Sequence, residues 1–458
     1  LTTRDRPVGL GSTKAFEALP IVTVQLPIFN ERNVIERLID AAAALDYPAD
    51  RLRIQVLDDS TDETTELAAA RVRHHAANGL SIVHVRRPDR AGFKAGALAY
   101  GLERTDGAFI LILDADFVPE PHFLRDALPA LADPAVGMVQ ARWSYLNRDH
   151  SLLTQAQAVL LDAHFAIEQA ARSRRGVLFN FNGTAGIWRA ETIRDAGGWR
   201  ADTLTEDLDL SYRAQIRGWR FVYRDDLTCP SELPTDINAL KTQQHRWAKG
   251  AIQVMRALLP RVWAARLPLK SKVEASFHLT SNLAYLVLLI DSLFLVVPSI
   301  VVRERYDLDV LLWLDIPLFA LATLSHVGFF LAGQARVYGS IGGRIGAAFA
   351  LMAMLIGLCF NNGRAVAEAL AGQRSPFVRT PKQGADTALA TSLVHRRYRP
   401  LRSPVFETIE IMLGLAYGVC VVWAVAQGYW VGAPFPALFA LMFLTVGLAS
   451  MRPRQVPT

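Results

Sequence analysis

Two pairs of carboxylates follow apolar runs of the sequence, at a spacing that suits the binding of one divalent cation. Asp114 and Asp116 come directly after the run FILIL, and Asp58 and Asp59 end the run LRIQVLDD. Two carboxylates can hold Mg²⁺ or Mn²⁺ while water and phosphate oxygens take the remaining coordination positions. The predicted chemistry is the neutralisation of a diphosphate group. An Asp-x-Asp pair alone is also typical of a solvated strand end, so the remaining sequence must distinguish the two.

Two further polar segments and one basic segment follow in the middle of the chain. FNFNGTAGIW contains Gly183 and Gly186, where the backbone can approach a sugar closely. Thr205, Glu206 and Asp207 begin a predicted helix, although the same residues also make an ordinary N-cap with first-turn carboxylates. KTQQHRWAKG is basic and helix-compatible, which is also typical of an amphipathic helix on a membrane surface.

The elements that must position these residues alternate between strands and helices. Strands are predicted at 21–29, 52–60, 81–85 and 109–113, with a helical pattern after each of the first three. This alternation predicts an α/β fold with a mainly parallel, doubly wound sheet, which binds ligands beyond the carboxyl ends of its strands. The two carboxylate pairs lie at such ends, and like charges repel unless a cation or ligand lies among them. Their clustering therefore favours a functional site.

The composition divides the chain into a soluble part and an apolar part. Of the 458 residues, 51% are hydrophobic, and the mean hydropathy is +0.20. Up to about Lys272 the sequence is typical of a soluble domain, and long apolar stretches follow. Much of the net charge of +6 lies in loops beside those stretches, where basic residues set orientation or contact anionic lipid. Nothing in this pattern requires nucleic acid as a partner.

The cysteines and two lone histidines have no spacing that predicts a metal or disulfide. Cys229, Cys359 and Cys420 are far apart and odd in number, so we expect packing residues in a reduced compartment. His164 and His245 have no partners at ligand spacing, and we interpret each as a structural or surface histidine.

Four stretches are long and apolar enough to span a bilayer, namely 275–302, 309–334, 406–427 and 430–450. The stretch 341–360 is ambiguous. If it crossed, the loop after it would carry eight basic residues to the outer side, against the positive-inside tendency. We therefore expect it to lie at the cytoplasmic interface, with the soluble domain and the C-terminal tail on the same side.

Seven segments, taken in order, resemble the family 2 membrane glycosyltransferases. They are VLDDSTD (56–62), KAGAL (94–98), DADFVPEPHFL (114–124), VQARW (139–143), FNGTAGIWR (181–189), TEDLDLSYRA (205–214) and QQHRW (243–247). The resemblance covers most of residues 21–260 and is strongest to the cellulose synthase-like A type, the glucomannan and mannan synthases; bacterial cellulose synthase is more distant. FVRTPK (377–382) resembles the gating-loop motif of that superfamily.

The resemblance implies a GT-A fold for the soluble domain and a role for each matching residue. Asp59 and Asp207 are the implied catalytic residues, with Asp207 as general base on the acceptor hydroxyl. Asp114 and Asp116 are the implied ligands of Mg²⁺ or Mn²⁺. The implied nucleotide-sugar-binding residues are Glu31, Asp58, Lys94, Asp114, Asp116, Gln243, Arg246 and Trp247. The implied acceptor-binding residues are Phe181, Asn182, Gly183, Thr184, Glu206 and Trp247, and the implied gating-loop residues are Phe377, Arg379, Thr380 and Lys382.

The resemblance further implies an inverting, processive hexosyltransferase. Its donor would be a nucleotide sugar of the UDP-glucose or GDP-mannose type, and its acceptor a growing β-linked polysaccharide that the membrane helices translocate. We expect a multi-pass protein of a bacterial-type plasma membrane with a cytoplasmic catalytic domain, and leave open whether an accessory subunit exists. The expected divisions are 1–20, 21–238 (catalytic), 239–272 (interface helices), 273–336 (two spans), 337–405 (interface helix and gating loop) and 406–458 (two spans and tail).

Two other functions compete with the polysaccharide synthase. A non-processive enzyme that glycosylates a lipid could share the Asp-x-Asp pair and the base. A transporter or scaffold that has lost catalysis is the other alternative, but every chemical residue that the family uses is present. The family's N-terminal transmembrane helix has no counterpart, and the chain begins at Leu1 without an initiator Met or a signal peptide, so we expect that upstream sequence was removed.

Overall fold

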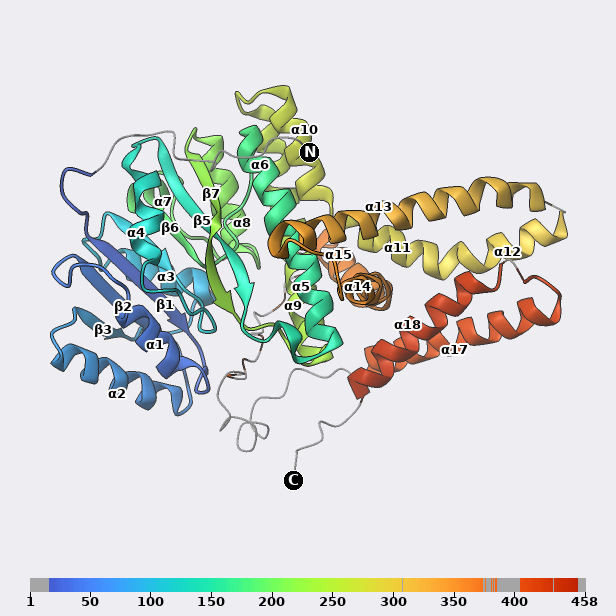
Figure 1. Ribbon diagram of the computed structural model, residues 1–458, viewed down its shortest axis with the longest axis horizontal. Helices are drawn as coiled ribbons and strands as arrows, with labels where there is room; N and C mark the ends of the chain where they lie inside the picture. Colours follow the sequence, from blue (N-terminus) through green and yellow to red (C-terminus); the bar gives the residue numbers. More distant parts are fainter. Residues whose placement is uncertain are drawn as a thin grey trace.

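The computed structural model describes residues 16–306, 308–373, 375, 380, 382, 384, 404–430 and 432–451. Their arrangement has two parts, a sheet covered by helices and a set of long helices that extend away from one side of it (Figure 1). Phe377 and Arg379, two of the four predicted gating-loop residues, lie outside the described residues.

A seven-stranded sheet forms the centre of the first part. Its order is β3 (Ile82–Val85), β2 (Leu52–Asp58), β1 (Val22–Ile28), β4 (Phe109–Ile112), β6 (Gly186–Arg189), β5 (Val136–Tyr145) and β7 (Arg220–Ser231). The first four strands are parallel, β6 is antiparallel to both of its neighbours, and β5 and β7 are parallel. The prediction of a mainly parallel α/β sheet, with strands at the four predicted runs, is confirmed.

Apolar residues on both faces explain why β4 is buried along its whole length. Leu111 belongs to one apolar cluster, whereas Ile110 and Ile112 belong to another, because successive side chains of a strand point to opposite faces. The first cluster includes side chains of α1 (Ile35–Ala43), α2 (Thr64–Ala77) and α4 (Phe123–Ala127). The second includes side chains of α3 (Phe93–Leu102), α6 (Ala170–Arg175), α7 (Ala190–Asp195) and α8 (Glu206–Ile216).

The helix α9 (Ile237–Ala264) connects the sheet domain to the apolar helices. It begins at Asp236, whose carboxylate accepts hydrogen bonds from the backbone N–H groups of Asn238 and Ala239. It contacts α8 on one side and α10 (Leu269–Thr280), α15 (Cys359–Leu370) and α18 (Pro434–Met451) on others. A buried ion pair, 2.7 Å between Lys241 Nζ and Glu410 Oε2, joins α9 to α17 (Pro404–Ala426). The helix that carries the QQHRW segment is therefore attached to both parts of the molecule.

Within the described residues, three helices are long and apolar enough to cross a membrane, or up to five if each of two bent pairs is one span. The three are α13 (Leu312–Tyr338), α17 and α18. The bent pairs are α10 with α11 (Leu283–Phe294), at 48°, and α14 (Ile345–Gly357) with α15, at 49°. The stretch predicted as one span at 275–302 is thus divided among α10, α11 and α12 (Val296–Arg305).

Candidate active site

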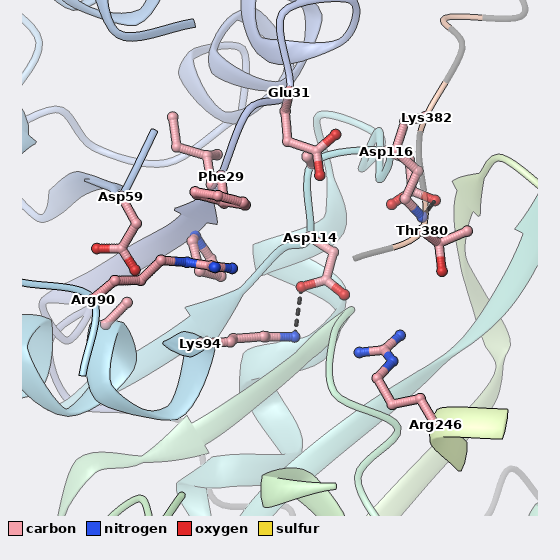
Figure 2. A pocket seen from close by; sticks show the side chains of 14 residues that line it. Phe29, Glu31, Asp59, Arg90, Lys94, Asp114, Asp116, Arg246, Thr380 and Lys382 are labelled. Atoms are coloured by element: carbon pink, nitrogen blue, oxygen red, sulfur yellow. Dashed lines mark ion pairs between the residues drawn. The ribbon is translucent and has the colours of Figure 1, made fainter. Parts of the chain in front are cut away.

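A first cavity lies beyond the carboxyl ends of β1, β2 and β4. Its charged and aromatic lining includes Phe29, Glu31, Asp59, Arg90, Lys94, Asp114, Asp116, Arg246 and Lys382 (Figure 2). The loops that follow parallel strands meet at one edge of a sheet, so residues that lie far apart in the sequence converge there. Four acidic and four basic side chains line this cavity.

A second cavity adjoins the first, because five residues line both: Lys94, Asp114, Asp116, Arg246 and Lys382. Its own lining adds the rings of Phe117, Trp143, Tyr145 and Trp247, and the polar residues Asn182, Glu206, Asp207 and Gln243. The structure therefore brings Asp59 and Asp116 together in one cavity, and Asp116 and Asp207 in the next.

Three of the predicted carboxylates, Asp59, Asp114 and Asp116, are each paired with a basic side chain of the same chain. Lys94 Nζ lies 2.5 Å from Asp114 Oδ1, and Lys382 Nζ lies 2.7 Å from Asp116 Oδ2. Arg87 holds Asp59 with two bonds, of 2.7 Å from Nε and 2.6 Å from Nη2. These pairs compensate the repulsion that the sequence predicts for clustered acids.

Asp116 has the environment of a carboxylate that can bind a further cation. Its side chain is 2% exposed, and its Oδ1 atom is buried without a hydrogen-bond partner among the described residues. Burial raises its pKa above the ordinary value, although Lys382 opposes this shift. The described part of the chain contains no group of three or more His, Cys, Asp or Glu side chains placed to hold a metal ion, and the predicted ligands Asp114 and Asp116 both line the first cavity. Two carboxylates suffice for Mg²⁺ or Mn²⁺ when phosphate and water supply the other oxygens.

Asp58 points away from both cavities, unlike its neighbour Asp59. Its carboxylate accepts a 2.8 Å hydrogen bond from the Ser60 backbone N–H and lies 2.8 Å from His84 Nε2. Burial would raise the pKa of Asp58, but the hydrogen bonds from His84 and Ser60 outweigh it and lower the pKa. From this position Asp58 anchors the end of β2, and its assignment to the nucleotide stays a prediction.

Lys94 lines both cavities and contacts the glycine turn at 183, which lines the second. Lys94 Nζ donates a 2.9 Å hydrogen bond to the Gly183 carbonyl oxygen and lies 3.9 Å from Glu206 Oε1. The pKa of Lys94 is raised, because Asp114 and Glu206 outweigh the effect of burial. Gly183 has φ +86°, and a Cβ atom there would lie 2.9 Å from Asp207 Oδ2. Only glycine suits both the backbone conformation and this close approach.

Phe181 and Thr184, also predicted to bind the acceptor, flank Asn182 and Gly183 in the sequence and are both buried. Phe181 is fully buried and packs edge-on against Trp188. The hydroxyl of Thr184 accepts a 2.9 Å hydrogen bond from the Asp114 backbone N–H. Neither residue lines either of the two cavities. Phe181 supports the turn through its packing, and Thr184 supports Asp114 through its hydrogen bond.

Asp207 lies in the first turn of α8 and lines the second cavity. Burial and the neighbouring charge of Glu206 raise its pKa to about 7, and Lys94 partly opposes this rise. A carboxylate with such a pKa accepts a proton far more readily than an ordinary aspartate does. Its chemistry fits a base that works near neutral pH.

The helix α9 places Gln243, Arg246 and Trp247 on the wall of the second cavity, because residues three and four apart share one face of a helix. The other face is held by α15, where Glu368 lies 2.8 Å from Lys249 Nζ and 3.3 Å from His245 Nε2. His245 thus contacts α15, and its interpretation as a structural or surface histidine stays a prediction.

Thr380 and Lys382, the described residues of the predicted gating loop, line the first cavity. The Lys382 backbone oxygen accepts a 3.0 Å hydrogen bond from Asn33 Nδ2, and its ammonium group pairs with Asp116. This segment therefore contacts the loop after β1 and the loop after β4 at once.

The sequence reasoning missed Arg87, Arg90 and the ring of Trp143. The Arg90 guanidinium carbon lies 3.4 Å from the centroid of the Phe29 ring, at the end of the first cavity. The signal that could have found both arginines is the basic run RRPDR between β3 and Lys94. Trp143 ends the segment VQARW that carries part of the resemblance, but nothing in its neighbourhood along the sequence gives it a role, since its place on the second cavity depends on how β5 meets helices distant in sequence.

Comparison with known proteins identifies the family of the sheet domain. A model of the glycosyltransferase-like family 2 matches residues 20–250. Glucomannan 4-beta-mannosyltransferase 2 of Arabidopsis thaliana is 46% identical over 248 residues, 53% of this chain and 46% of that protein. Glucomannan 4-beta-mannosyltransferase 1 of Oryza sativa subsp. japonica is 42% identical over 250 residues, 54% of this chain and 48% of that protein.

The chain spans about half the length of these curated relatives. Among solved structures, one similar chain is the mannosyltransferase PcManGT from Pyrobaculum calidifontis, in complex with GDP-Man and Mn²⁺. The sequence identity is 21%, the TM-score is 0.48, and the superposed region covers 74% of the present chain and 91% of PcManGT. The family model covers just over half of the present chain and includes every strand of the sheet and the whole of the QQHRW segment. The chain therefore belongs to the glycosyltransferase-like family 2.

Proposed function

We propose that the protein is an inverting, processive glycosyltransferase that elongates a β-linked polysaccharide from a nucleotide-sugar donor. The observation that carries this proposal is the common wall of the two cavities. Lys94, Asp114 and Arg246 line both, so a donor diphosphate in the first cavity would lie next to an acceptor in the second. The reacting sugar would lie at that wall, within reach of Asp207.

Asp207 takes the proton of the acceptor hydroxyl in this proposal. A sugar hydroxyl is a poor nucleophile until a positioned base removes its proton, and the pKa of Asp207, about 7, suits that work. The oxygen attacks the anomeric carbon as the bond to the diphosphate breaks, so one displacement inverts the configuration. An α-linked donor sugar then yields a β-linkage.

Lys94 and Arg246 stabilise the departing diphosphate. Both side chains line the first cavity, and charge that develops on the leaving oxygen is stabilised by cations already in place. Asp114 and Asp116 would hold Mg²⁺ or Mn²⁺, which when bound neutralises further charge on the diphosphate. The buried, unpartnered Oδ1 of Asp116 supports this assignment.

The names of the relatives support mannose as the transferred sugar and a 4-β-linkage as the product. The helices α13, α17 and α18 support a membrane protein, and the attachment of α9 to α17 supports transfer close to that membrane. We place the catalytic domain in the cytoplasm, where nucleotide sugars are the donors, with translocation of the product through the membrane helices.

The experiment that tests the proposal incubates the full chain, in detergent and in vesicles, with radiolabelled GDP-mannose or UDP-glucose and Mg²⁺ or Mn²⁺. We expect a polymer that a β-mannanase or a cellulase degrades. A solvent-extractable glycolipid instead of polymer would support the lipid-glycosylating alternative. The absence of any transfer from either donor would overturn the proposed function.

A further inference from the structure

A turn of π-helix lies directly behind the second cavity. It covers His164–Gln169, between α5 (Leu152–Ala163) and α6, and the described structure shows it in contact with α13. Isolated π turns inside α-helices are frequent at functional sites, because the wider turn redirects side chains. Here it directs His164 and Gln169 toward the same side chain, Asn182, which lines the second cavity.

The hydrogen bonds of Gln169 determine the orientation of the Asn182 amide. Gln169 Nε2 lies 2.9 Å from the backbone oxygen of Asn180, which can only accept, so this Gln169 atom must be the amide nitrogen. The same nitrogen lies 2.6 Å from the Asn182 side chain, and the atom that it meets there is therefore the Oδ1 oxygen. Asn182 must then direct its Nδ2 group the other way.

The Nδ2 group of Asn182 meets His164. Its distance to His164 Nε2 is 3.2 Å, and because the amide nitrogen can only donate, Nε2 must accept. The proton of the neutral imidazole is then on Nδ1, which lies 2.9 Å from Glu168 Oε2 and donates to it. Glu168 also pairs with Arg172 at 2.8 Å, and these partners lower its pKa against the effect of burial. The donor and acceptor of each hydrogen bond that links Gln169, Asn182, His164 and Glu168 are therefore determined.

We propose that His164 and Gln169 are positioning residues that hold the Asn182 amide in one orientation for the acceptor. This inference rests on the proposed function, since Asn182 is taken to contact the glycan. The backbone of Asn182 is fixed as well, because the Asn182 N–H donates a 3.0 Å hydrogen bond to Gln140 Oε1. A fixed amide presents a defined donor and acceptor to a sugar hydroxyl and loses less rotamer entropy on binding.

The test compares two substitutions of similar size. H164Q carries an acceptor oxygen that can reach the position of Nε2, whereas H164N carries polar atoms only near the position of Nδ1. Initial rates are measured with saturating radiolabelled donor and increasing β-1,4-linked mannotetraose, or cellotetraose if UDP-glucose is the donor. We expect H164N to raise the acceptor KM about tenfold and H164Q less than about threefold, with kcat changed less than about twofold.

A matched control and a double variant separate positioning from structural support. His75 lies 2.8 Å from Asp40 in a similar histidine and carboxylate pair at α2, away from both cavities, and H75A is expected to leave KM unchanged. In an N182A background, H164N should add no further rise in KM, because the residue that it positions is gone. If H164N does not fold, H164A, which also lacks the acceptor at the position of Nε2, is compared in the N182A background in its place.

The outcomes distinguish this inference from the function on which it rests. Transfer by the unaltered chain, with the same acceptor KM for H164N and H164Q, would overturn the positioning role alone. An equal loss of kcat in both variants, undiminished in the N182A background, would also overturn it. No transfer by the unaltered chain from either donor would overturn the proposed function and the inference together.

Discussion

The two cavities differ in what lines them, although they share a wall. The first is lined mainly by charge, with the acids Glu31, Asp59, Asp114 and Asp116 facing the cations Arg90, Lys94, Arg246 and Lys382. The second keeps part of this charge but adds the rings of Phe117, Trp143, Tyr145 and Trp247. Charge suits a diphosphate and its cation, whereas flat apolar faces suit sugar rings. The difference supports the proposed placement of the donor in the first cavity and of the acceptor in the second.

The cavities also differ in how the chain builds them. Most of the first is made by loops that follow β1, β2, β3 and β4, consecutive strands of the parallel half of the sheet. The second is made by β5, the glycine turn, α8 and α9, which come from separate regions of the chain. The donor side therefore depends on local loops, and the acceptor side on the packing of distant elements. Substitutions on each side should break one function and spare the other.

The largest expected effect is that of Asp207→Asn. Because Asn cannot take the acceptor proton, we expect polymer synthesis to fall about a thousandfold, while the affinity for the nucleoside diphosphate stays within about twofold. Synthesis is measured by incorporation of radiolabel and affinity by calorimetry. If synthesis stayed near the original rate, Asp207 could not be the base, and the proposal that the acceptor binds in the second cavity would lose its main support.

Asp116→Ala should break the donor side instead. We expect the enhancement of nucleoside diphosphate affinity by Mn²⁺ to fall about a hundredfold, since one of the two carboxylates for the cation is lost. Titration of the nucleotide with and without Mn²⁺ measures this enhancement. An enhancement equal to that of the unaltered chain would count against a metal site at Asp114 and Asp116. Lys382→Ala, which removes the partner of Asp116 and keeps both carboxylates, is the comparison variant.

The pH dependence sharpens the assignment of the base. The pKa of Asp207 is raised to about 7, and a base acts only when it is ionised, so activity should be present above this pH and lost as pH falls through it. We expect kcat to decrease about tenfold per pH unit below the pKa. The residual rate of Asp207→Asn should not follow this limb. A rate for the unaltered chain that is constant between pH 5.5 and about 8 would contradict the assignment.

The smallest expected effect is that of Trp247→Ala on the acceptor side. Loss of the ring should raise the acceptor KM about tenfold and shorten the polymer, with donor affinity unchanged, because the ring lines only the second cavity. Trp247→Phe keeps an apolar face and should lose less. Chromatography of the polymer gives its length. A loss of donor affinity with normal polymer length would reverse the roles of the two cavities.

Much of the sheet could be predicted because its signals are local. The run FILIL is apolar at every position, as a strand covered on both faces requires, and it forms β4. The same reasoning could have gone further at Asp58 and Asp59. Successive residues of a strand point to opposite sides, so the two could not both face one ligand, and the structure directs Asp58 to His84.

The long apolar stretches were predicted less completely. Hydropathy identifies the residues that lipid can accept, but it does not report the direction of the helix axis. The 48° bend between α10 and α11 falls between Thr280 and Leu283, inside a stretch that hydropathy treats as continuous. The second bend, at 49°, likewise lies within the helix pair that covers the stretch interpreted as one interface helix.

By itself, the sequence determined the first four strands, the carboxylates at their ends, the acidic start of α8 and the apolar stretches, because each is a pattern within a few neighbouring residues. Only the tertiary structure decided that Lys382 pairs with Asp116 and that His164 holds Asn182. These contacts join residues from separate elements, and their distances depend on how helices pack against the sheet. Packing between distant elements leaves no periodic pattern of residues in the sequence. The lining of the second cavity could therefore be identified only from the tertiary structure.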